Sequence, residues 1–109
     1  MARHHLGEFE QILLLALAQA GADASGVDIR ELIEARTGRA ISPGAIYTGF
    51  QRLERRGFVA SAFGDPTPAR GGKRRRLYSL RPAGARALAA AQTALAGMAR
   101  GLRRKALLP

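Results

Sequence analysis

Five cationic side chains fall within the seven residues from Arg70 to Arg76. The surrounding stretch 64–76 also holds two prolines and three glycines, a composition that excludes a helix and predicts a long, exposed hairpin tip. Cations on such a tip neutralise phosphate groups, which is binding chemistry rather than catalysis. Three of them are the expected phosphate or minor-groove contacts: Arg70, Lys73 and Arg74. Arg75 and Arg76 enter the following strand, so alternation turns one of these two away.

The charge of the chain is divided unevenly along its length. The formal net charge is +10. Residues 1–65 carry seven arginines and eight acids, whereas residues 66–109 carry eleven Lys and Arg and no acid. A surface that only confers solubility mixes both signs. The segregation therefore favours a polyanion as the partner of the second half.

Few of the residue types that catalysis needs are present. The chain has no cysteine, and its only histidines are His4 and His5, which excludes disulfides, Cys-ligated zinc and a Ser-His-Asp triad. The stretch 71–73 reads Gly-Gly-Lys but lacks the spacing of a nucleotide-binding phosphate loop. We expect no enzyme activity, no metal and no cofactor.

No membrane segment is expected either. The longest apolar run, 12–18, is far shorter than the roughly 20 residues that span a bilayer. It follows the acidic residues Glu8 and Glu10, the wrong flank for a secretory signal. The sequence predicts a cytoplasmic protein without a membrane partner.

Three helices are predicted ahead of the hairpin. The first, over 6–19, is apolar on nearly every side, so it is either a central core helix or a helix that lines a dimer. The second begins at Ser25, where Asp28 completes a capping box. The third begins at Ser42-Pro43, a cap followed by proline at the first helical position, and ends near Arg56.

Two strands and a long helix follow. Residues 58–63 and 77–80 have strand composition, and the last helix starts at Pro82 and can run to about Arg104. Its leucines recur every seven residues, which is typical of a coiled-coil seam. Some 22 helical residues form a rod of about 33 Å, too long for a domain this small to cover. The expected dimerisation residues are Phe9, Leu13, Leu14, Leu17, Leu88, Ala91, Leu95, Met98 and Leu102.

This order of elements predicts a mainly α fold with a small β-hairpin. It is that of a winged helix-turn-helix, with a three-helix core and a two-stranded wing over 1–81 and a C-terminal dimerisation helix over 82–109. In that architecture the third helix enters the major groove of DNA. Its expected DNA-binding residues are Ser42, Gly44, Ala45, Tyr47, Thr48, Gln51 and Arg52.

Two stretches of the third helix and its exit also carry a family signature. They read Ser42-Pro43-Gly44-Ala45-Ile46-Tyr47 and Gln51-Arg52-Leu53-Glu54-Arg55-Arg56-Gly57-Phe58-Val59. They resemble the Ser-Pro-Gly-x-aliphatic-Tyr and x-Arg-Leu-Glu-x-x-Gly-aliphatic-aliphatic pattern of PadR-family bacterial transcriptional regulators. The resemblance covers about residues 7–90 and matches the branch with a short C-terminal part. Arg81 departs from it, standing where the family usually has a Thr or Ser that caps the last helix.

The resemblance implies a homodimer on a palindromic operator, usually a repressor, with a small-molecule effector as a further partner. We therefore expect a sequence-specific double-stranded DNA-binding transcriptional regulator. Two alternatives remain open. One is an RNA- or ribosome-associated basic protein, which the scarcity of aromatic residues disfavours because single-stranded RNA readers stack bases on them. The other is an interaction adaptor that holds another protein with its C-terminal helix.

Overall fold

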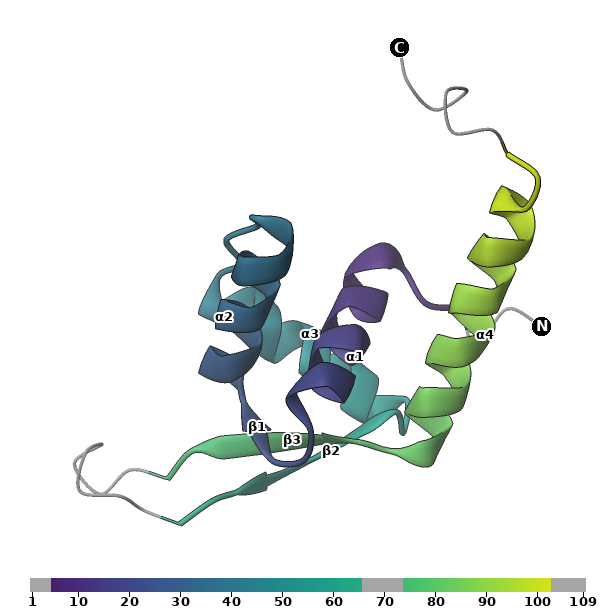
Figure 1. Cartoon of the computed structure of the whole chain (residues 1–109). Helices are drawn as coiled ribbons and strands as arrows, with labels where there is room; N and C mark the ends of the chain where they lie inside the picture. Colours follow the sequence, from purple (N-terminus) through teal and green to yellow (C-terminus); the bar gives the residue numbers. More distant parts are fainter. Residues whose placement is uncertain (1–4, 66–73, 103–109) are drawn as a thin grey trace.

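Residues 5–65 and 74–102 are described by a computed structural model of the chain. In this part, the helices and strands follow the predicted order apart from one added short strand, β1 (Figure 1). The helices are α1 (Glu8–Ala20), α2 (Gly26–Thr37), α3 (Pro43–Arg55) and α4 (Pro82–Ala99). The strands are β1 (Ala24–Ser25), β2 (Val59–Phe63) and β3 (Arg76–Leu80). The prediction of a winged helix-turn-helix followed by a C-terminal helix is confirmed.

The helices start where the capping residues predict. Ser25 Oγ accepts a hydrogen bond from the backbone N–H of Asp28 at 3.2 Å, and the Asp28 carboxylate accepts one from the N–H of Ser25 at 3.1 Å. Ser42 Oγ accepts from the N–H of Ala45 at 3.1 Å, and Pro43 follows as the first helical residue. Arg81 caps α4 without a side-chain hydrogen bond, the weaker start that its replacement of Thr or Ser predicts.

The first helix is the centre of the protomer's core. α1 contacts α2, α3, α4 and β3, and in Figure 1 it lies between α2 and α4. Gly49 of α3 lets the two helices approach closely, since a Cβ there would overlap the Leu13 side chain. Within residues 5–65 and 74–102, the largest fully buried side chains are Leu13, Leu14, Leu17, Ile29, Ile33, Ile46, Phe50, Leu53 and Val59.

This burial corrects the expectation that Leu13, Leu14 and Leu17 line a dimer. Their exposed fractions are 0%, 0% and 1%, so one chain already covers them. Leu88 is also buried in the protomer, and Phe9 and Ala91 pack against the same core. The apolar sides of α1 are buried within one protomer because four elements of the same chain surround this helix. Only the later part of the predicted seam remains uncovered: Leu95, Met98 and Leu102.

The sheet has three antiparallel strands in the described residues, in the order β1-β3-β2. Strands β2 and β3 form the predicted hairpin, with Val59 opposite Leu80 and Phe63 opposite Arg76. The sequence did not predict β1. Its two residues are too few to show a strand pattern, and the strand exists because they pair with β3.

The last helix contacts the body of the protein as far as Gln92, whose amide donates to Gln11 of α1 at 3.1 Å. Gly84 packs directly on the carbonyl of Phe58, where no Cβ would fit, and that carbonyl accepts a hydrogen bond from the N–H of Arg81 at 3.0 Å. The distal half then extends away from the other helices (Figure 1). The helix ends at Ala99 instead of the predicted Arg104. Gly101, with φ of 81°, follows that end, and glycine disfavours continuation of a helix.

Candidate nucleic-acid interface

The outer face of α3 gathers the residues that the sequence predicts to read DNA. The inner face buries Ile46, Phe50 and Leu53, and the spacing of these residues fixes which side points outward. Tyr47 is 48% exposed, and nothing lies within 4 Å of a Cβ placed on Gly44. Every predicted contact on this helix is exposed: Ser42, Gly44, Ala45, Tyr47, Thr48, Gln51 and Arg52.

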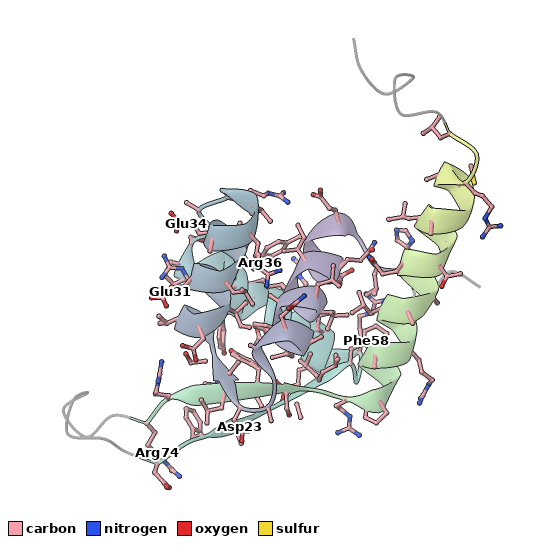
Figure 2. The ribbon with its side chains drawn as sticks, viewed as in Figure 1. Asp23, Glu31, Glu34, Arg36, Phe58 and Arg74 are labelled. Atoms are coloured by element: carbon pink, nitrogen blue, oxygen red, sulfur yellow. The ribbon has the colours of Figure 1, made fainter. Side chains whose placement is uncertain are left out.

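Of the three predicted wing cations, the structure describes Arg74, near the end of the hairpin. Figure 2 shows Arg74 there, well away from the helices. Its Nε donates to the carbonyl oxygen of Gly64 at 3.2 Å. Arg70 and Lys73 lie outside the described residues, so their expected contacts stay predictions.

Arg75 and Arg76 contact different elements of the fold. Arg75 donates to Ser25 Oγ at 2.8 Å and lies 4.0 Å from the Asp28 carboxylate. Arg76 instead donates to Ser61 Oγ at 2.9 Å. Arg75 is thus held against the start of α2, whereas Arg76 belongs to the sheet face that carries Tyr78.

A short polar chain ties α3 to the wing. Ser61 Oγ lies 2.9 and 3.0 Å from the two carboxylate oxygens of Glu54. Because a hydroxyl both donates and accepts, Ser61 joins the Glu54 carboxylate to the guanidinium of Arg76. The three residues come from α3, β2 and β3, so these contacts fix the position of Arg76 relative to α3.

A cleft of about 550 Å³ lies between the starts of α2 and α3 and the strand β3. Tyr47 and Tyr78 contribute to its wall, and its described lining contains no carboxylate. Four arginines line it: Arg30, Arg74, Arg75 and Arg76. A cleft with one sign of charge focuses the field on an anion that enters it. This arrangement suits a phosphate-bearing backbone next to the α3 surface.

Two exposed acids of α2 lie outside this cleft, whereas Asp28 at the start of α2 lies 4.0 Å from Arg75 in its lining. Figure 2 shows Glu31 and Glu34 on the outer side of α2, away from the sheet. Neither residue contributes to the cleft lining.

Tyr78 sits where the cleft meets the core. It is 4% exposed, and burial raises the pKa of its hydroxyl, while the nearby Arg76 acts in the opposite direction. Sequence reasoning missed Tyr78 and Arg30 as lining residues. The tertiary structure positions Arg30, whose Nε donates to the Ile41 carbonyl at 2.8 Å. A local sequence pattern does not predict such a contact.

The comparisons with known proteins agree with this architecture. The model of the transcriptional regulator PadR-like family matches residues 13–90. No curated protein matches the chain. Among the described residues, no helix is long and apolar enough to cross a membrane.

Solved structures share the fold. A transcriptional regulator from Clostridium thermocellum is 24% identical, with a TM-score of 0.69 over 90% of this chain and 89% of that one. A PadR family transcription regulator from Clostridium difficile is 21% identical, with a TM-score of 0.72 over 84% and 91%. Bacillus subtilis PadR in complex with operator DNA is 19% identical, with a TM-score of 0.64 over 75% of this chain and 46% of that one. Since the family match spans most of the sequence, the chain belongs to the PadR-like family of transcriptional regulators.

Proposed function

We propose that this chain regulates transcription by binding double-stranded DNA at specific sequences. The observation that carries the proposal is the position of the cleft lined by four arginines beside the exposed face of α3, with Tyr47 contributing to both. α3 enters the major groove, where base edges present distinct donor and acceptor patterns. The hairpin and the cleft hold the adjacent backbone. The likeness to a PadR solved with operator DNA supports the same assignment.

The active species is a homodimer built on α4. Leu95, Met98 and Leu102 are 60%, 85% and 49% exposed. The spacing of three residues places Leu95 and Met98 on one face of α4, and Leu102 follows just after the helix ends. An exposed apolar stripe of this kind is a liability in a monomer. A second copy of the chain covers it.

A second apolar surface is available to the same partner. Leu15 of α1 is 37% exposed and borders a groove of about 210 Å³ between α1 and α2, which Ile12 and Leu32 also line. A two-fold dimer places two α3 helices on one side of the DNA, roughly 34 Å apart, and so requires a palindromic operator. The protein then acts as a repressor, and a small-molecule effector that alters the dimer releases it.

The alternative of an RNA-associated protein has little support in the structure. Of the six aromatic residues of the chain, only Tyr47 and Phe63 are largely exposed. Single-stranded RNA readers need a platform of several exposed rings. The adaptor alternative leaves the arginine cleft without a purpose, since a protein partner on α4 would not touch it.

Footprinting of the purified full chain on its own promoter tests the proposal. A protected, two-fold symmetric segment that survives an excess of unrelated duplex DNA is the expected result. Equal competition by single-stranded RNA would instead support the RNA-associated alternative. If the chain binds no nucleic acid, the proposed regulator function is refuted and the adaptor alternative is supported.

A further inference from the structure

Phe63 is an exposed aromatic residue close to two guanidinium groups of the hairpin. It is the last residue of β2 and is 53% exposed. Its ring centroid lies 4.6 Å from Cζ of Arg76 and 5.9 Å from Cζ of Arg74. Both distances are within the roughly 6 Å over which a cation is attracted to an aromatic face.

Each of these arginines also has one polar anchor. Arg76 stands directly opposite Phe63 across the ladder, and its Nη1 donates to Ser61 Oγ at 2.9 Å. Arg74 donates through Nε to the Gly64 carbonyl at 3.2 Å. The guanidinium groups of Arg74 and Arg76 are therefore each held by a hydrogen bond and by the ring of Phe63.

Packing of the core does not explain an aromatic residue at this position. Phe63 is absent from the buried cluster and from the side chains that pack against it. An exposed Phe gains little from burial. The two cation–π contacts are the interactions that the structure gives its ring.

A ring beneath a guanidinium suits phosphate binding. The cation–π contact uses the face of the planar group, whereas its N–H donors lie in the plane and stay available for phosphate oxygens. A free arginine side chain loses rotamer entropy when it is fixed on a ligand. An arginine that is already ordered loses less, so its contact with the ligand is stronger.

We propose that Phe63 is a positioning residue that pre-orders Arg74 and Arg76 for the DNA backbone. This inference rests on the proposed function, because it names how that binding surface is organised. Phe63 acts through the two arginines and makes no necessary contact with DNA itself.

The test measures equilibrium affinity of the full chain for its footprinted duplex over a range of salt concentrations. Phe63→Leu is expected to weaken binding about tenfold because the cation–π contacts are lost. The salt dependence of log K keeps its slope, since no charge is removed. Phe63→Trp is the conservative variant and retains the wild-type affinity, because Trp is the best partner for a cation. A loss in Phe63→Trp equal to that in Phe63→Leu would overturn the proposal.

A double-mutant cycle separates positioning from direct contact. In a chain that carries both Arg74→Ala and Arg76→Ala, the further change Phe63→Leu is expected to have no effect on affinity. A further tenfold loss in that background would show that Phe63 touches DNA itself and contradict the proposal.

Thermal melting of each variant provides the control for folding. Phe63→Leu should melt close to the wild type, since the side chain is half exposed. A fall in affinity that only follows a fall in the folded fraction would overturn the inference. Wild-type chain that binds duplex DNA no better than Phe63→Leu refutes the role of Phe63 alone, whereas wild-type chain without affinity for DNA refutes the proposed function as well.

Discussion

The ring of Tyr78 in the middle strand stacks on the ring of Phe50 in α3, with centroids 4.2 Å apart and an angle of 19° between the planes. Phe50 is fully buried and Tyr78 nearly so. Offset or stacked aromatic pairs add to the stabilisation that burial supplies. The pair therefore fixes α3 on the three-stranded sheet. Tyr78 also lines the arginine cleft, so this contact lies at the border of the cleft.

Alkaline pH should reduce the contribution of Tyr78 to the free energy of unfolding. Burial raises the pKa of Tyr78, so the folded chain favours the neutral phenol over the phenolate. Its contribution to the free energy of unfolding is fully present below the unfolded pKa, about 10, and is lost as the pH rises through the raised folded value. Unfolding free energies measured from about pH 9 to 12 check this, with Tyr78→Phe expected to reduce the alkaline loss.

Absorbance of the phenolate gives a direct second measurement. The chain has only two tyrosines, so Tyr47→Phe leaves Tyr78 as the one reporter. Titration of folded protein should show a midpoint above that of the same variant in denaturant. Coincident midpoints would contradict a buried, neutral Tyr78.

Local signals in the sequence predict most of the fold. The Ser25-Asp28 capping box and the Ser42-Pro43 start appear where expected because such contacts lie within four residues of one another. The two-residue strand β1 and the position of Arg30 escaped prediction, since each depends on a partner far along the chain. The same reason explains the error at α1. An apolar surface on a helix does not say whether the covering element comes from the same chain.

The candidate site was predicted in part. The α3 residues follow from helical spacing, whereas the contacts of Arg75 with Ser25 and of Arg76 with Ser61 depend on the tertiary fold. Phe63 had no signal at all, because an aromatic residue at a strand end is ordinary strand composition. Its relation to two arginines is a property of the sheet alone.

Two glycines of α4 should respond in opposite ways to alanine. Gly84 lies on the carbonyl of Phe58, so the added Cβ of Gly84→Ala overlaps backbone and should destabilise the chain by about 1–3 kcal/mol. Gly97 has nothing within 4 Å of such a Cβ. Gly97→Ala should therefore stabilise the helix by up to about 1 kcal/mol. Chemical denaturation measures both, and a stable Gly84→Ala would mean that α4 docks differently.

The wing should supply affinity without sequence preference. If Arg70, Lys73 and Arg74 of two protomers meet phosphates, about six counterions are released, and log K falls with log salt at roughly −0.9 per contact. The triple alanine variant should weaken binding to every duplex and flatten this slope. Arg86→Ala serves as the control for lost charge, because Arg86 is exposed on α4 and does not line the cleft. Unchanged affinity and slope in the triple variant would show that these three cations do not contact DNA.

Sequence preference should instead depend on α3. Alanine at Thr48, Gln51 or Arg52 is expected to cost about 1–3 kcal/mol on the footprinted site and much less on random duplex. Thr93→Ala removes an exposed hydroxyl from α4 and should change neither affinity. Equal losses on both duplexes would mean that these residues touch only phosphates, and the assignment of α3 to the major groove would fail.

Dimerisation should depend on the exposed end of α4. Leu95→Asp places a carboxylate in the stripe that a second copy is proposed to cover, and burial of an unpaired charge is costly. The variant should dissociate at concentrations where the wild type sediments as a dimer, and specific DNA binding should be lost with it. Thr93→Asp adds the same charge two residues away, on the opposite side of the helix, and should leave both properties unchanged. Sedimentation of the wild type decides the larger question, since a monomer that binds a palindromic site tightly would be incompatible with the dimer and with the role proposed for α4.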